Sequence, residues 1–150
     1  MPLGLLIGED TLVAVWAAST FKRRQMPVDR AFGIVDNGLL KGAILLHNFN
    51  GINIEMSYYG PNTLTAGITR AVARVLITEF NVARLTVVTS KRNKRLMHGL
   101  TKLGFALEGH QKRFYGHNDC NRNTGVRFVA FREAICKVAG IDPVLAEQKG

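Results

Sequence analysis

The chain has 150 residues, of which 47% are hydrophobic and 21% are charged. This length and composition exclude intrinsic disorder, and we expect residues 1–150 to form a single domain. No apolar run approaches the roughly 18 residues of a membrane span, and residues 1–8 lack a basic leader, so we expect a cytoplasmic protein that is not membrane-bound. The net charge of +9 favours anionic partners, such as nucleic acid, a membrane surface or a phosphorylated cofactor.

The sequence contains two cysteines, Cys120 and Cys136. Their spacing fits neither a disulfide framework nor a zinc ligand set, so reduced thiols are expected. We find no Ser/His/Asp order, no HExxH motif and no cluster of metal-ligating residues, and therefore predict no metal site.

The first half predicts one helix followed by three strands. Residues 9–21 place apolar side chains at helical spacing, and Pro27 lies beyond the basic end of this segment. Asn37-Gly38 and Asn50-Gly51 are typical of two-residue hairpin turns. They predict an antiparallel meander between residues 30 and 60.

Two-residue turns would also fix the register of the meander. Val35 would lie opposite Leu40, and His47 opposite Ile54. This register places His47 on one face of the sheet and Glu55 on the other. Both faces carry apolar residues, so helices are expected to cover both.

The second half alternates between helical and strand patterns. Residues 64–80 carry one apolar helical stripe, and residues 84–90 form a short β-branched run that predicts a buried strand parallel to the third meander strand. Together they make a β-α-β unit. A second helix is expected from Asn93 to Leu103, followed by strands near residues 106–115 and 126–132. A polar loop, residues 116–125, joins those strands.

Two segments carry a resemblance to a known family. The first is YYGPNTLTAGI, residues 58–68, in which a strand leads through a tight loop into a helix. The second is NKRLMHGLTKLGFALEG, residues 93–109, with Tyr115 shortly after it. These segments and the order of elements, over residues 9–132, resemble the GNAT N-acetyltransferases. The second segment is most similar to the branch that acetylates ribosomal-protein N-termini, and the first also resembles GNAT-like proteins of bacteriophages.

The resemblance implies an α/β fold of the GNAT type, with a mixed central sheet, an antiparallel meander, one β-α-β unit and helices on both faces. It implies acetyl-CoA as co-substrate, with its pyrophosphate held by backbone N–H groups at a helix start. The cofactor-binding residues implied are Tyr58, Tyr59, Leu64, Thr65, Ala66, Gly67, Ile68, Thr69, Arg92 and Asn93. Leu64 and Thr69 depart from the family pattern, which has a basic or Gln residue and a small residue there. The alternative is a plain helix start capped by Asn62 or Thr63.

Two residues are candidates for the chemistry implied by the resemblance. Glu55 is the one carboxylate on the third meander strand and would act as general base on the attacking amine, with Asn48, Asn53 and Ser57 around it. Its alternative role is that of a strand residue that is paired with a basic neighbour or points to solvent. Tyr115 would protonate the departing CoA thiolate, because many GNATs place a tyrosine hydroxyl there. The chain departs from the family in the second helix, where Leu100 stands in place of a common tyrosine.

The function implied is transfer of an acetyl group from acetyl-CoA to a primary amine of a protein, a peptide or a small molecule. The alternative is a GNAT scaffold that has lost catalysis and binds nucleic acid or another partner. The basic residues from Lys91 to Arg95 are compatible with both, because they can contact either the phosphates of CoA or those of a nucleic acid.

Overall fold

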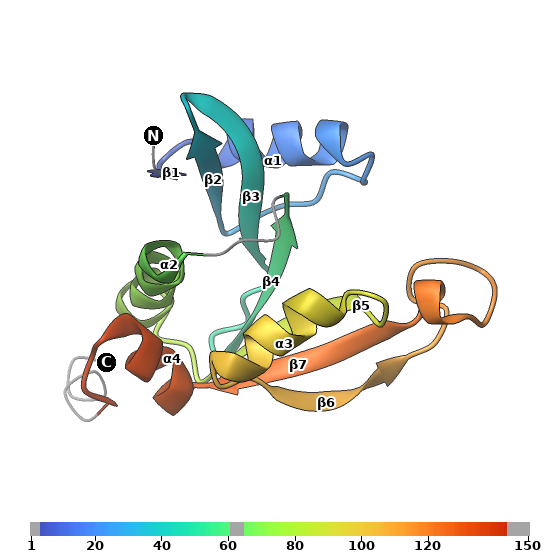
Figure 1. Ribbon diagram of the computed structural model, residues 1–150. Helices are drawn as coiled ribbons and strands as arrows, with labels where there is room; N and C mark the ends of the chain where they lie inside the picture. The colour runs from blue at the N-terminus through green and yellow to red at the C-terminus, as the bar shows by residue number, and fades with distance from the viewer. Residues whose placement is uncertain (1–3, 61–64, 144–150) are drawn as a thin grey trace.

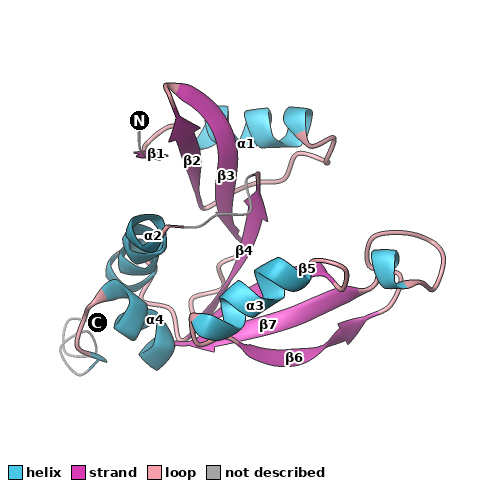
Figure 2. Cartoon of the chain, viewed as in Figure 1, coloured by secondary structure: helices cyan, strands magenta, loops and turns pink. Residues whose placement is uncertain are grey.

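The computed structural model describes residues 4–60 and 65–143 of the chain (Figure 1). In chain order the strands and α-helices are β1 (Gly4–Leu6), α1 (Asp10–Thr20), β2 (Arg30–Asp36), β3 (Leu39–His47), β4 (Asn53–Tyr59), α2 (Ala66–Thr78), β5 (Arg84–Ser90), α3 (Lys94–Lys102), β6 (Ala106–Gln111), β7 (Gly125–Phe131) and α4 (Arg132–Ala139). A short 3₁₀ helix, Asn121–Asn123, lies in the β6–β7 loop (Figure 2). Among the described helices, none has the length and apolar character required to cross a membrane.

The strands form one seven-stranded sheet in the order β1-β2-β3-β4-β5-β7-β6. All neighbours pair antiparallel except β4 and β5, which are parallel and are connected through α2. The expected meander, β-α-β unit and mixed sheet are therefore confirmed. The sequence patterns did not predict β1 or α4, and the strand expected near residues 106–115 ends at Gln111.

The first hairpin has the predicted turn. Asn37 and Gly38 adopt φ angles of 53° and 76°, and Val35 pairs with Leu40. Positive φ at both central residues gives a turn whose twist matches that of the flanking strands. The predicted register is therefore confirmed here.

The second hairpin does not have the predicted register. His47 lies opposite Glu55, not Ile54. The Asn50 side chain accepts hydrogen bonds from the N–H groups of Ile52 and Asn53 at 2.9 and 2.7 Å, and Asn48 adopts a φ of 55°. This longer connection shifts the pairing by one residue.

The shift changes which side chains share a face. His47 and Glu55 now lie on the same side of the sheet, with Ser57 two residues further along β4. The prediction that His47 and Glu55 occupy opposite faces was wrong. The corrected register places an imidazole directly beside the candidate base.

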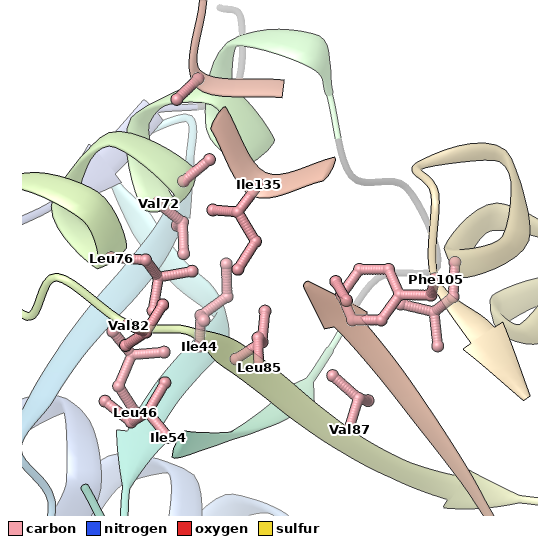
Figure 3. Packing of buried hydrophobic residues seen from close by; sticks show 14 of the residues in the cluster. Ile44, Leu46, Ile54, Val72, Leu76, Val82, Leu85, Val87, Phe105 and Ile135 are labelled. Atoms are coloured by element: carbon pink, nitrogen blue, oxygen red, sulfur yellow. The ribbon is translucent and has the colours of Figure 1, made fainter. Parts of the chain in front are cut away.

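Helices cover both faces of the sheet, as expected. On one face Val13 and Ala17 of α1 pack against Ala31, Ala43 and Leu45. On the other face α2, α3 and α4 bury a larger apolar cluster (Figure 3). Its members include Ile44, Leu46, Ile54, Val72, Leu76, Val82, Leu85, Leu100 and Ile135.

The pairing between β4 and β5 stops halfway along both strands. Asn53–Met56 pair with Arg84–Val87, but the last three residues of β4 have no partners on β5. The strand β5 continues beside β7 as far as Ser90. Figure 1 shows β4 and β5 diverging beyond this point. The sheet therefore opens between β4, which stays paired with β3, and β5, which stays paired with β7.

The Asn53 side chain links β4 and β5 where the two strands are paired. The Asn53 Oδ1 atom accepts hydrogen bonds from Thr86 Oγ1 at 2.7 Å and from Arg84 Nε at 3.2 Å. Thr86 is 1% exposed, so its hydroxyl group has no access to water as a substitute. The structure thus gives Asn53, which lies on the same face of β4 as Glu55, a role in the β4–β5 contact.

We predict that Asn53→Ala lowers the free energy of unfolding by about 1–3 kcal/mol, because the substitution leaves the buried Thr86 hydroxyl without a partner. Urea denaturation measures this loss. The double variant Asn53→Ala/Thr86→Val removes both partners and should lose less than the sum of the two single losses. Additive losses would show that the hydrogen bond does not fasten the two strands.

Candidate functional site

A cleft of about 910 Å³ lies where β4 and β5 part. Its walls come from the end of β3, from β4, β5 and the start of α3, and from two loops, α1–β2 and β6–β7. The cleft brings together five of the residues singled out from the sequence: Glu55, Tyr58, Tyr59, Asn93 and Tyr115. A separate apolar cavity of about 60 Å³ lies in the core between the sheet and α2, α3 and α4.

Glu55 contacts two neighbours through one carboxylate oxygen. Its Oε2 atom accepts a hydrogen bond from Asn48 Nδ2 at 2.5 Å and lies 3.4 Å from His47 Nδ1. The Glu55 side chain is 31% exposed. The carboxylate is thus oriented by an amide and an imidazole while it remains open to the cleft. Asn48 occupies the supporting position that was expected of it.

His47 connects Glu55 to Ser57. The Nε2 atom of His47 lies 2.8 Å from Ser57 Oγ, and the residue is 8% exposed. Burial lowers the pKa of His47 below its ordinary value and outweighs the opposite effects of the Glu55 and Asp29 carboxylates. The imidazole is therefore neutral at neutral pH, with one nitrogen donating and the other accepting.

Tyr115 reaches the cleft from the β6–β7 loop. Its hydroxyl lies 3.4 Å from the carbonyl oxygen of Val88, and the Arg23 guanidinium lies 5.9 Å from its ring centroid. Burial raises the pKa of Tyr115, so the hydroxyl remains protonated at neutral pH and can act as a proton donor. A Cβ at the next residue, Gly116, would approach within 2.5 Å of the Asn123 side chain, so the loop requires glycine there.

Tyr58 and Tyr59 project to opposite sides of β4. The Tyr58 hydroxyl is buried without a hydrogen-bond partner among the described residues, and burial raises its pKa. Tyr59 stacks on Phe21 with ring centroids 5.4 Å apart. The Tyr58 ring therefore lies on the α2 side of β4 with its hydroxyl buried, whereas Tyr59 lies on the α1 side.

The start of α2 offers backbone donors. Thr65 is the N-cap and accepts a hydrogen bond from Ile68 N at 3.2 Å, which leaves the N–H groups of Ala66 and Gly67 without intrahelical acceptors. The Ile68 side chain is buried in the core, and the Thr69 hydroxyl donates to backbone oxygens of its own helix. Their N–H groups donate to the side chain and the carbonyl of Thr65, so Ala66 and Gly67 are the residues whose N–H groups remain for an anion at this helix start. Leu64, Asn62 and Thr63 lie outside the described residues.

The start of α3 combines a cap with positive charge. Asn93 Oδ1 accepts a hydrogen bond from Leu96 N at 3.2 Å, and the Asn93 side chain also lines the cleft. Arg92 is exposed, and its N–H group donates to Ser90 Oγ. Within the described part of the chain, no acidic side chain forms an ion pair with the basic residues of 91–95. Their charges are therefore available to a phosphorylated ligand.

Sequence reasoning missed the joint arrangement of His47 and Ser57 with Glu55. Ser57 had been placed beside Glu55 only as a polar neighbour, and His47 had been placed on the other face. The signal available was the Glu-x-Ser spacing on a strand, which places both side chains on one face. The position of His47 depended on the hairpin register. In the described residues, no three His, Cys, Asp or Glu side chains gather to form a metal site.

Comparison with solved structures identifies the architecture. A chimera of the Vibrio cholerae spermidine N-acetyltransferase SpeG with hSSAT superimposes with a TM-score of 0.66 over 90% of this chain and 99% of that chain, at 15% identity. The Vibrio cholerae spermidine N-acetyltransferase in complex with CoA and spermine has a TM-score of 0.62 over 89% and 97% of the two chains, at 16% identity. The chain has the GNAT fold.

A GNAT-family acetyltransferase from Bacillus anthracis matches 69% of this chain and 66% of its own length, with a TM-score of 0.56 and 18% identity. No protein-family model matches the sequence, and no curated protein does so either. The GNAT fold is therefore evident from the arrangement of elements and not from overall sequence similarity.

The lowered pKa of His47 predicts how stability depends on pH. Below about 6.5 the unfolded chain takes up a proton at this residue before the folded chain does, so the free energy of unfolding falls as the pH falls through this range. We expect this loss to be smaller in His47→Gln. Urea denaturation between about pH 7.5 and pH 5 measures it.

His98→Gln is the matched control, because His98 is exposed on α3. Its stability should follow that of the wild type across the same range. If His47→Gln and the wild type lose stability equally on acidification, the imidazole is not kept neutral by burial.

Proposed function

We propose that this chain is an acetyl-CoA-dependent N-acetyltransferase acting on a primary amine. The observation that carries the proposal is the cleft at the parting of β4 and β5, which contains a carboxylate and a protonated tyrosine in a chain with the GNAT fold. A solved neighbour with this fold holds CoA and spermine. The resemblance of residues 93–109 favours an amine on a peptide N-terminus as acceptor, in the cytoplasm.

Acetyl-CoA is proposed to lie with its pyrophosphate at the start of α2. The N–H groups of Ala66 and Gly67 would bind it with the help of the helix dipole. The residues Lys91–Arg95 would contact the phosphate on the ribose, and Tyr58, which lines the cleft, would contact the pantetheine arm. The thioester would then lie between β4 and β5.

In the proposed reaction the amine nitrogen attacks the thioester carbonyl carbon, and the carbon–sulfur bond breaks. Glu55 is the base for the ammonium or amine proton, acting directly or through an intervening group, and Tyr115 donates a proton to the departing thiolate. Both groups face the same cleft. Burial raises the pKa of Tyr115 and keeps its hydroxyl protonated, as the role of acid requires, and the Asn48 amide donates to Glu55 and orients it.

We predict that Glu55→Gln lowers the rate of acetyl transfer by about 10²- to 10⁴-fold and leaves the affinity for acetyl-CoA nearly unchanged. The acceptor is first selected from spermidine, a lysine peptide and peptides with free N-termini by amine-dependent release of CoA thiol. Calorimetry then measures acetyl-CoA affinity in both proteins. Glu133→Gln is the control, because Glu133 is an exposed acidic residue of α4 outside the cleft.

If Glu55→Gln transfers acetyl groups within a factor of about two of the wild type, far below the range for a general base, Glu55 is not the base. If no tested amine releases thiol and acetyl-CoA does not bind, the enzyme proposal itself fails.

One observation favours a second function, a nucleic-acid-binding module on the same scaffold. The net charge is +9, and the exposed basic residues of 91–95 lie together without acidic partners among the described residues. Such a patch attracts phosphate backbones without sequence preference. It would serve equally well for the phosphates of CoA, so ligand chemistry must discriminate between the two functions.

We predict that simultaneous Gln substitution of Lys91, Arg92, Lys94 and Arg95 lowers the affinity for acetyl-CoA by about tenfold or more. The affinity for dephospho-CoA should fall less, because dephospho-CoA lacks the phosphate on the ribose. Calorimetry measures both affinities. The control carries Gln at Arg24, Lys41, Lys112 and Lys137, which are exposed at other places. Tight binding of a random duplex with a steep salt dependence, together with no affinity for acetyl-CoA, would favour the nucleic-acid module.

A further inference from the structure

Three polar side chains of the cleft lie in series across β3 and β4. Ser57 Oγ lies 2.8 Å from His47 Nε2, and His47 Nδ1, which has no hydrogen-bond partner among the described residues, lies 3.4 Å from Glu55 Oε2. Glu55 and Ser57 are two residues apart on one face of β4, and His47 is directly opposite Glu55 on β3. All three line the cleft. The imidazole is thus held between a hydroxyl and a carboxylate.

The donor and acceptor groups of these side chains define one consistent arrangement. A neutral imidazole donates from one nitrogen and accepts at the other, and a hydroxyl can do both. If Nε2 accepts the Ser57 proton, Nδ1 carries the ring hydrogen and faces the carboxylate. The Asn48 amide, which donates to Glu55 Oε2, holds that oxygen beside the imidazole. Burial of His47 keeps the ring neutral, as this arrangement requires.

We propose that Ser57, His47 and Glu55 form a proton relay in which the Ser57 hydroxyl, and not the Glu55 carboxylate, takes the proton directly from the attacking amine. This inference rests on the proposed N-acetyl transfer. It adds a catalytic residue, Ser57, and a positioning residue, His47, to the base already assigned.

As the amine nitrogen bonds to the thioester carbonyl carbon, its proton passes to Ser57 Oγ, whose own proton passes to His47 Nε2, and the Nδ1 proton of His47 passes to Glu55. After the N-acetyl amine has left, Glu55 returns a proton to Nδ1 and His47 Nε2 returns one to Ser57. Ser57 Oγ releases the proton taken from the amine to water in the cleft, so the starting tautomer of His47 is restored. The sulfur leaves with the electron pair of the carbon–sulfur bond and takes a proton from Tyr115, which regains one from water. The products are an N-acetyl amine and CoA thiol.

The rate of acetyl transfer is measured at saturating acetyl-CoA, with the amine that gives the fastest thiol release. The wild type is compared with Ser57→Ala, His47→Gln, Glu55→Gln and the double variant Ser57→Ala/Glu55→Gln. A relay predicts losses of about 10²- to 10⁴-fold for each single variant. It also predicts that the double variant is no slower than Glu55→Gln, because members of one unit are not additive. The controls Ser19→Ala and His98→Gln change exposed residues of α1 and α3 and should match the wild type.

A proton inventory adds a readout that a purely structural role would not affect. The rate of the wild type should depend on the deuterium fraction of the solvent along a curve, because several protons move in one step, and that of Ser57→Ala should not. Melting curves and acetyl-CoA affinity establish that each variant is folded. If His47→Gln fails to fold, Ser57→Ala and the double variant decide the outcome.

The possible failures are distinguishable. If the wild type transfers acetyl groups and Glu55→Gln is slow, but Ser57→Ala stays within about twofold of the wild type, Glu55 acts directly and the relay is overturned. If the wild type transfers no acetyl group to any tested amine, the proposed function fails and the relay falls with it.

Discussion

The early end of pairing between β4 and β5 is the constraint on which the site depends. Antiparallel pairing with β3 holds β4 on one side, and pairing with β7 holds β5 on the other. The Asn53 contacts fasten the two strands only at the paired end. Beyond Met56 and Val87 the strands separate, and backbone groups that a continuous sheet would use for pairing border a cleft instead.

The titratable side chains of the cleft differ in how far they are buried. Burial keeps His47 neutral and Tyr115 protonated, whereas Glu55 stays partly exposed and accepts a hydrogen bond from Asn48. Environments that separate titratable groups in this way are typical of sites for general acid and base chemistry. The exposed basic patch near α3 is distinct in character, because its charges are open to solvent and suited to phosphate.

Local patterns predicted most of the fold but less of the site. The Asn37-Gly38 turn, the apolar stripe of α2 and the β-branched run of β5 each specify their own structure, and the corresponding predictions are confirmed. The turn at Asn50 could not be predicted in the same way. The Asn50 side chain accepts hydrogen bonds from two backbone N–H groups, and the connection between β3 and β4 is longer than a two-residue turn. That one-residue shift moved His47 to the face of Glu55. Tyr115 depends on a loop held by packing between Gly116 and Asn123, which sequence periodicity does not report.

Acetyl-CoA is proposed to bind between the parted strands and the start of α2. Amide chemical shifts measured by NMR on the isotope-labelled protein during titration with acetyl-CoA test this binding mode most directly. We expect saturable shifts at Ala66, Gly67, Val88 and Asn93. The amides of β1, which pairs only with β2 at the far edge of the sheet, should stay unchanged. Shifts confined to the exposed basic residues of 91–95, or no shifts at all, would contradict it.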